Sequence, residues 1–232
     1  WASSGATSML PKFVDNMELK LRNFDPCTIL RQTIETSDVT GGGAELFLYQ
    51  SGYLTIKGYQ MSVYILGFPN SEVRQALYET VLPALTLRGN SDIQSIQSDL
   101  LLAIQLGNLP EAMKCLKALI ADVPYSNKKL ASMDMEERYR LIMSTIFNAI
   151  GCRVEVEKMI ATGRIDMVVE TTQYIYVLEL KLSDNGGVDA AAEQIRAKQY
   201  AEPFKADKRK VIALAIELDD RGKGLVDWKE VF

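Results

Sequence analysis

Hydrophobic and polar positions follow a clear order in the C-terminal half of the chain. From about residue 124, the pattern predicts one long helix, then three strands, then a second helix and a last strand. Their predicted bounds are 133–150, then 152–159, 164–170 and 173–182, then 189 to about 202, and 210–218. Because the last run is almost continuously apolar, we expect it to be buried on both faces in the middle of a mixed sheet. The pattern predicts an α/β protein with an αβββαβ core.

The first ninety residues mix helical and strand patterns. Two short runs rich in β-branched and aromatic residues, 52–56 and 62–67, predict a pair of strands. A helix capped by Asn70 or Ser71 follows. Helix, strand pair and helix make a mainly helical, winged-helix-like order, and Gly41-Gly42-Gly43 predicts a flexible turn. Two amphipathic helices in 92–123 then predict a helical connector, so the expected parts are 1–90, 91–123 and 124–232.

The strands at 164–181 carry the residues with the clearest chemistry. Asp166 lies on one strand, and Glu179 and Lys181 lie two residues apart on the next. Side chains alternate along a strand, so Glu179 and Lys181 share a face with the core residues Ile175 and Val177. On the earlier strand we expect Asp166 to share a face with Val168, and Ile165, Met167 and Val169 to occupy the other.

Two carboxylates in one place need a cation or a proton between them. If Asp166 and Glu179 meet, Mg²⁺ or Mn²⁺ suits their oxygens and keeps waters that can become nucleophiles. Lys181 could then orient that water or stabilise charge on a phosphate. Sequence alone leaves the register open, so a salt-bridged patch at the end of the sheet is the alternative.

Composition narrows the chemistry further. The chain has no histidine, which excludes Ser-His-Asp and Cys-His nucleophiles and His-ligated zinc. The net charge of −4 gives no broad attraction to nucleic acid, and the one basic cluster is Arg196, Lys198, Lys205, Lys208, Arg209 and Lys210. A solvated helix end and loop is an equally good interpretation of that cluster.

Three features bear on where the protein works. The cysteines Cys27, Cys115 and Cys152 are odd in number and far apart, which favours reduced thiols and a cytoplasmic protein. No apolar stretch is long enough to span a bilayer, so we expect no membrane contact. The first residue, Trp1, leads us to expect a piece of a longer protein.

On these strands the chain resembles the PD-(D/E)XK nuclease superfamily, which has an αβββαβ, restriction-endonuclease-like core. The resemblance covers roughly residues 124–232 and is closest to a bacterial branch in which the domain follows an AAA-ATPase-like region. It rests on the strings 163–170 and 174–181, on 193–195 with 198–203, and on Glu136 and Tyr139.

The resemblance implies a role for each matching residue. Asp166 and Glu179 would bind Mg²⁺ or Mn²⁺ with the backbone carbonyl of Leu180, and Lys181 would be the catalytic lysine. Glu136 would be an additional acid near the metal, and Gln194 a polar residue that supports the site. Tyr200 is expected to serve in packing. The chain departs from the branch at Arg140, where a His or similar polar residue is expected.

The N-terminal part resembles the lid segment of the same ATPase-like region, through the strings 4–10, 50–56 and 66–70. The chain contains no Gly-x-x-x-x-Gly-Lys-Ser/Thr, so ATP hydrolysis is not assigned to it. Two functions stay open. One is metal-dependent hydrolysis of phosphodiesters in nucleic acid, with DNA as the expected substrate. The alternative is a catalytically inactive interaction or DNA-binding module attached to an ATPase.

Overall fold

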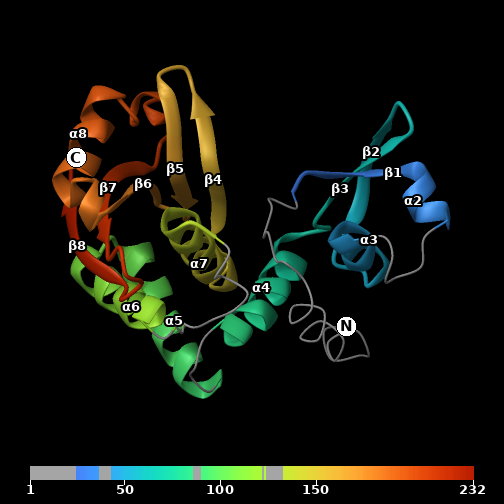
Figure 1. Cartoon of the computed structure of the whole chain (residues 1–232), viewed down its shortest axis with the longest axis horizontal. Helices are drawn as coiled ribbons and strands as arrows, with labels where there is room; N and C mark the ends of the chain where they lie inside the picture. The colour runs from blue at the N-terminus through green and yellow to red at the C-terminus, as the bar shows by residue number, and fades with distance from the viewer. Residues whose placement is uncertain (1–24, 37–42, 86–89, 122, 124–132) are drawn as a thin grey trace. The chain divides into compact units, whose positions relative to one another are not determined.

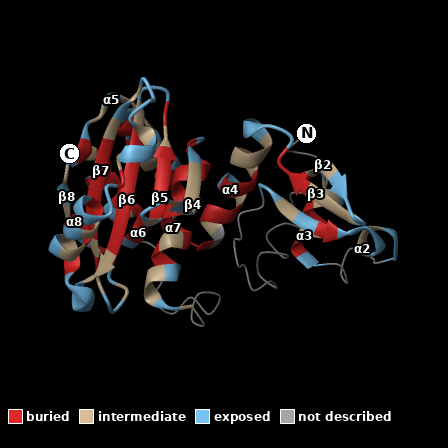
Figure 2. Cartoon of the chain, turned by 90° about the horizontal axis from the view of Figure 1, so that it is seen from above, coloured by how far each residue is buried: buried red, intermediate tan, exposed pale blue. Residues whose placement is uncertain are grey.

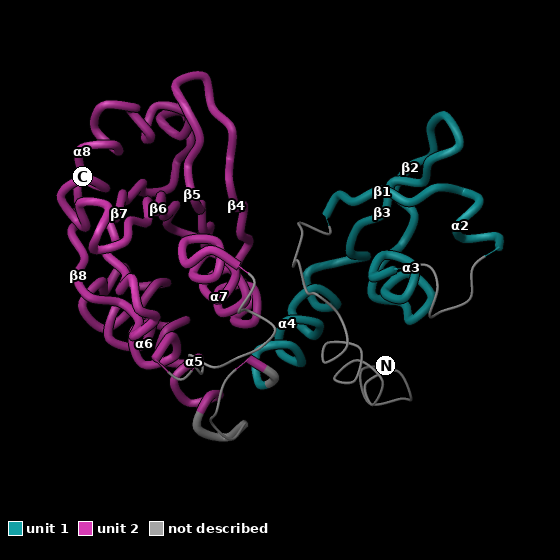
Figure 3. Tube along the Cα trace, in the orientation of Figure 1, with its two compact units in different colours: residues 1–84 teal, residues 85–232 magenta. Residues whose placement is uncertain are grey.

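The computed structural model describes residues 25–36, 43–85, 90–121, 123 and 133–232. The chain divides into two compact units, residues 1–84 and residues 85–232 (Figure 3). The helices at 92–123, predicted as a connector, therefore belong to the same compact unit as the αβββαβ core. Each unit is described separately below.

The first unit contains a small antiparallel sheet in the order β1-β3-β2. Its elements are β1 Cys27–Leu30, α2 Arg31–Thr36, α3 Gly43–Gln50, β2 Thr55–Gln60, β3 Val63–Gly67 and α4 Ser71–Leu85. The predicted strand pair is confirmed by β2 and β3, whereas β1 was not predicted. The side chain of Asn70 caps α4, because its Oδ1 accepts a hydrogen bond of 2.9 Å from the Val73 amide. Of the predicted glycine turn, residues 41 and 42 lie outside the described residues.

The second unit is built on a five-stranded sheet in the order β4-β5-β6-β7-β8 (Figure 1). Its helices are α5 Asn90–Leu106, α6 Leu109–Ala121, α7 Met135–Ala149 and α8 Gly187–Ala197, with short 3₁₀ helices η1 Ser183–Asn185 and η2 Glu202–Phe204. Its strands are β4 Arg153–Ile160, β5 Gly163–Glu170, β6 Tyr174–Leu182, β7 Lys210–Leu218 and β8 Leu225–Glu230.

The pairing of these strands confirms the predicted mixed sheet. Strands β6 and β7 are parallel, and the other three pairs are antiparallel. Strand β7 lies between two neighbours and is mostly buried, as its apolar run predicts (Figure 2). Strand β8, which flanks it, was not predicted.

Helices cover both faces of the sheet. One face packs against α8, in a core that joins Val168, Val177 and Ala213 to Ala192 and Ile195 of that helix. Tyr176 points to the opposite face. Its hydroxyl donates a 2.6 Å hydrogen bond to the carbonyl of Ile104, which attaches α5 to the sheet. Helix α7 packs against β4, β5 and β6, where it can reach the acid-bearing strands.

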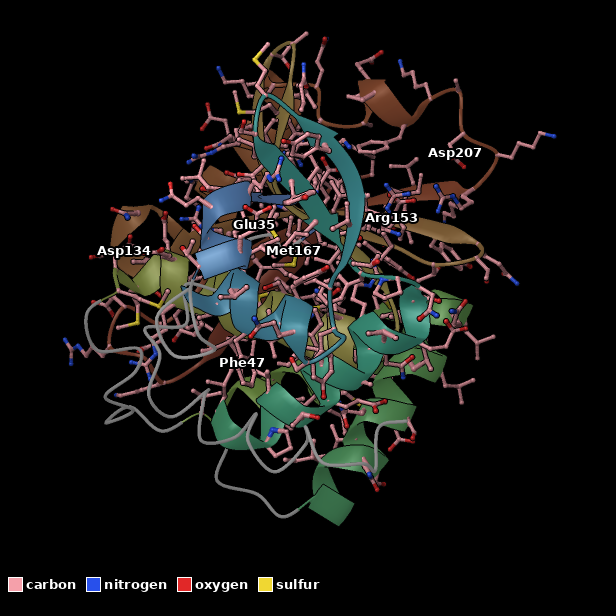
Figure 4. All side chains as sticks on the ribbon, turned by 90° about the vertical axis from the view of Figure 1, so that its right-hand side faces the viewer. Glu35, Phe47, Asp134, Arg153, Met167 and Asp207 are labelled. Atoms are coloured by element: carbon pink, nitrogen blue, oxygen red, sulfur yellow. The ribbon has the colours of Figure 1, made fainter. Side chains whose placement is uncertain are left out.

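Helix α7 begins at Met135, two residues after its predicted start, and Asp134 is its N-cap. The carboxylate of Asp134, labelled in Figure 4, accepts a 2.8 Å hydrogen bond from the amide of Glu137. The two following glutamates of the first turn, Glu136 and Glu137, also suit the positive end of the helix.

Helix α8 differs from its prediction at both ends. Asp189 is not its cap but a residue of its first turn, because the helix begins at Gly187. Instead, Oε2 of Glu217 on β7 accepts a 3.0 Å hydrogen bond from the Val188 amide. The helix ends at Ala197 rather than near residue 202, and Gln199 then takes a positive φ of 52°, which a helix cannot continue.

Strand β5 is irregular near Asp166. Ile165 belongs to the same core cluster on the α8 side as Val168, so the prediction that these two residues face opposite sides is wrong. The β4–β5 pairing omits Glu157 and Asp166, although the pairs on either side are present. Glu157 also has a positive φ of 54°. The strict alternation on which the prediction depended is therefore broken between Ile165 and Val168.

Two further observations concern the cysteines and the hydropathy of the helices. Within the part of the chain that the structure describes, Cys27, Cys115 and Cys152 form no disulfide, and the last two are buried. Within the described ranges, each helix is too short or too polar to cross a membrane.

Candidate functional site

Asp166 and Glu179 lie where the pairing between β5 and β6 ends. The β5–β6 pairing runs from Glu170↔Ile175 to Met167↔Leu178, and the next two residues in register would be Asp166 and Glu179. That pair is not formed. On its other edge, β6 stays paired with β7 through Leu182. The two acids therefore lie just beyond the last rung between β5 and β6.

The Asp166 carboxylate is held on both oxygens. Its Oδ2 accepts a 2.9 Å hydrogen bond from the Leu180 amide. Its Oδ1 accepts one of 3.2 Å from Nη1 of Arg140 on α7. The side chain is 12% exposed. A backbone amide and a guanidinium therefore satisfy the two oxygens of this carboxylate.

The Glu179 carboxyl is more deeply buried, with its side chain 1% exposed. Its Oε1 lies 3.5 Å from Nζ of Lys181, and its Oε2 has no hydrogen-bond partner among the described residues. Burial, helped by the nearby Asp166 charge and opposed by Lys181, raises the pKa of Glu179 to about 8. A buried acceptor without a donor can be satisfied by a proton or by a cation.

Arg140 connects Asp166 to a third acid that the sequence analysis missed. Its Nη1 also lies 3.5 Å from Oε1 of Glu157, which lies 3.1 Å from Nη1 of Arg164. Arg140 was noted only as a departure from the family pattern. Counting back through the β4–β5 hairpin would have placed Glu157 opposite Asp166, so the register carried a signal for it.

The other two predicted residues lie around this centre rather than on the two carboxylates. Glu136 is one turn before Arg140 on α7, on the same side of the helix. Among the described residues, no hydrogen bond or ion pair joins it to Asp166 or Glu179. Gln194 donates a 3.0 Å hydrogen bond to the hydroxyl of Tyr200.

Tyr200 links α8 to the strand that carries Asp166. Its ring is buried in the core, and its hydroxyl donates a 2.7 Å hydrogen bond to the carbonyl of Arg164. Gln194 therefore reaches the site indirectly, through a backbone contact two residues before Asp166. Tyr200 was predicted to serve in packing, and the hydrogen bond from its hydroxyl to Arg164 was not predicted.

The basic cluster is partly neutralised by its own neighbours. Nη2 of Arg209 lies 2.8 Å from Asp207, which is labelled in Figure 4, and 2.9 Å from Glu170. Lys205 lies 2.6 Å from Glu202. These ion pairs favour the interpretation of a solvated helix end and loop over that of a continuous basic surface.

The donor set fits a small, hard cation that keeps most of its water. Within the described ranges, no three Asp, Glu or Cys side chains lie together in a way that could hold a metal. Mg²⁺ does not need such a group, since it is usually bound by one or two carboxylates plus waters and substrate phosphates. Asp166 and Glu179, with its partnerless Oε2, are two carboxylates of this kind.

Comparisons with known proteins agree with this interpretation of the C-terminal part. Residues 134–228 match a family model described as PD-(D/E)XK nuclease superfamily, which confirms the resemblance for that segment. The match does not include an ATPase-like region. The chain is also 27% identical over 248 residues to a protein of Azotobacter chroococcum mcd 1 described as "Uncharacterized protein in vnfD 5'region". The alignment covers 98% of this chain and 45% of that relative. No solved structure gives a significant match.

Proposed function

We propose that residues 134–228, which match the PD-(D/E)XK nuclease superfamily model, hydrolyse phosphodiester bonds of nucleic acid, with DNA as the substrate, using Mg²⁺ or Mn²⁺. The observation that carries the proposal is the buried, partnerless Oε2 of Glu179 beside Asp166 at the opening of the sheet. Each carboxylate has one cationic neighbour, Arg140 for Asp166 and Lys181 for Glu179. Ion pairing of this kind still leaves Oε2 of Glu179 buried without a donor among the described residues, and a cation would satisfy that oxygen.

Asp166, Glu179 and the Leu180 carbonyl would hold the cation. When bound, it supplies an activated water and neutralises charge on the phosphate. Glu179 must lose its proton before it can act as a ligand. The Leu180 amide fixes Oδ2 of Asp166, which leaves the orientation of that carboxylate settled before any ligand arrives.

Lys181 would act on the substrate. Its Nζ lies near Oε1 of Glu179, and its side chain is 23% exposed, so it extends from the buried carboxyl toward solvent. An ammonium there can donate to a non-bridging phosphate oxygen or orient the attacking water. Glu136 would add an acid from α7, and Gln194 would keep Tyr200 and hence the start of β5 in place.

A second candidate is a module that no longer cuts, and the Arg140 contact favours it. The guanidinium supplies Asp166 with a permanent cation inside the protein. A site neutralised in this way could bind nucleic acid or a partner without metal. In either case we propose a bacterial, cytoplasmic protein in which this domain accompanies an ATPase-like region. The chain spans less than half of the length of the relative from Azotobacter chroococcum mcd 1, so that relative is long enough to contain such a region.

A cleavage assay separates the two candidates. Wild type, Asp166→Asn, Glu179→Gln and Lys181→Met are incubated with single-stranded, double-stranded and branched DNA and with RNA, with Mg²⁺, Mn²⁺ or EDTA. We expect cleavage that EDTA abolishes and that each substitution lowers by about 100-fold or more, the usual scale for a lost electrostatic or proton-transfer group. The matched controls are Asp184→Asn and Lys223→Met, at exposed positions outside the site. Absent cleavage by wild type, or equal cleavage by all variants, would favour the inactive module.

A further inference from the structure

Arg140 lies between two carboxylates that belong to different strands. Its Nη1 is 3.2 Å from Oδ1 of Asp166 on β5 and 3.5 Å from Oε1 of Glu157 on β4. The side chain is 14% exposed, so the charge is largely withdrawn from water. The β4–β5 pairing is interrupted at these two acids, which lets both side chains turn toward α7.

Neither acid depends on Arg140 alone. Asp166 keeps the Leu180 amide on its other oxygen, and Glu157 keeps Arg164 at 3.1 Å. The guanidinium is therefore shared, and it can shift from one carboxylate to the other without leaving a buried charge unpaired. Glu157 is 45% exposed and Arg164 is 51% exposed, so both have room to adjust.

A divalent cation on Asp166 changes the balance between these two contacts. A charge of +2 and a guanidinium on one carboxylate repel each other strongly at such short range, in a poorly solvated place. This electrostatic repulsion falls when the guanidinium moves away from Asp166 and pairs with the more exposed Glu157.

We propose that Arg140 is an internal counterion of Asp166 that a divalent cation must displace, and that the displaced guanidinium then pairs with Glu157. The inference rests on the metal site of the proposed function. In the metal-free protein, Arg140 keeps Asp166 neutralised and oriented. Metal affinity is then set by a competition inside the protein, in which Arg140 opposes binding and Glu157 favours it.

Calorimetric titration with MnCl₂ tests this competition without relying on cleavage. We expect Arg140→Met to bind Mn²⁺ about 10-fold more tightly than wild type, a change equivalent to about 1.4 kcal/mol. Arg140→Lys keeps the positive charge and should stay close to wild type. Glu157→Gln should bind about 3-fold more weakly, and Arg140→Met with Glu157→Gln should bind like Arg140→Met alone, because Glu157 acts through Arg140.

Arg164→Met is the matched control for a general charge effect. It removes a guanidinium that contacts Glu157 but not Asp166, so we expect less than about a 2-fold change. Thermal unfolding of each variant identifies any that do not fold. If Arg140→Met is among them, Glu157→Gln retains the test, and Mn²⁺ binding by it as tight as by wild type would overturn the inference.

The outcomes separate this inference from the nuclease proposal. Equal or weaker Mn²⁺ binding by a folded Arg140→Met, or binding by Arg140→Lys as tight as by Arg140→Met, would overturn the counterion role even if wild type cleaves DNA. The predicted order of affinities without any cleavage would support the counterion role and count against the nuclease. Absence of Mn²⁺ binding by every variant would overturn both.

Discussion

Folding raises the pKa of the Glu179 carboxyl and so favours its protonated form. Its ordinary pKa is 4.5, and burial with the nearby Asp166 raises it to about 8. The folded state therefore holds a proton that the unfolded state has lost between these values. The contribution of Glu179 to the free energy of unfolding is fully present below pH 4.5, falls as pH rises, and is gone above about pH 8.

Glu179→Gln should remove this pH dependence. Above pH 8.5 we expect the variant to exceed wild type in free energy of unfolding by about 1–3 kcal/mol, since one pKa unit corresponds to 1.4 kcal/mol. Near pH 4.5 the two should be similar, because both side chains are then uncharged. Urea unfolding at both pH values measures the difference, with Glu193→Gln on the exposed side of α8 as the control. A constant difference across this range would show that Glu179 does not titrate as the burial implies.

The same proton links metal affinity to pH. Because Glu179 must be ionised to act as a ligand, Mn²⁺ should bind more tightly as pH rises toward about 8, with little further change above it. Binding at pH 7 should release a proton. Calorimetry in two buffers of different ionisation enthalpy measures that proton directly. An affinity independent of pH from 6 to 8.5 would count against Glu179 as a ligand.

The spacing of Asp166, Glu179 and Lys181 was sufficient to identify these candidate residues from the sequence. Counting through the β4–β5 hairpin could have placed Glu157 opposite Asp166, but no residue pattern indicates the positive φ at Glu157 or its contact with Arg140 of α7. A glycine there would have been a signal, but a glutamate with positive φ is rare.

Among the helices and strands, the order αβββαβ followed from hydrophobic periodicity, and the ends of the elements were harder to predict. The start of α8 was misplaced because its cap comes from Glu217 on β7, distant in sequence, rather than from a neighbouring side chain. Strand β8 was missed because only two of its six residues, Leu225 and Val226, are aliphatic, so it lacks the apolar run that marked β7.

The cap from Glu217 predicts a specific cost for Gly187→Ala. A Cβ on Gly187 would lie 2.3 Å from Oε2 of Glu217, and the backbone there has a φ of 57°. We expect a loss of about 2 kcal/mol or more in free energy of unfolding, from displacement of the cap together with the strained backbone. In a Glu217→Ala background the clash is absent, so the same substitution should cost less. Equal costs in both backgrounds, by urea unfolding, would mean that the contact with Glu217 is not the cause.

For the chain as a whole, the main difference concerns the helices predicted as a connector. Helix α6 contributes buried residues such as Ala112, Leu116 and Leu119, and α5 accepts a hydrogen bond from Tyr176 of the central sheet. The amphipathic pattern of these helices predicts that one face of each is buried, but it does not indicate which surface of the protein that face packs against. The division into domains remains a prediction, with boundaries at 1–90, 91–123 and 124–232. The two compact units of the structure divide after residue 84.

Truncation measures what these helices contribute. A fragment of residues 85–232 should unfold cooperatively, whereas residues 124–232 should unfold at a much lower temperature or not fold, because removing α5 and α6 exposes apolar surface of the sheet and of α7. Thermal unfolding by circular dichroism compares the two fragments. Similar midpoints would support the prediction that residues 91–123 are a connector.

All of the proposed chemistry depends on Asp166 and Glu179 sharing one divalent cation. Crystals of the protein soaked in Mn²⁺ at about pH 8.5, measured for anomalous scattering, test this directly. We predict one peak in the opening between β5 and β6, within about 2–2.5 Å of a carboxylate oxygen of both residues, as expected for a hard oxygen-ligated cation. No peak there, or a peak that contacts neither carboxylate, would contradict the account.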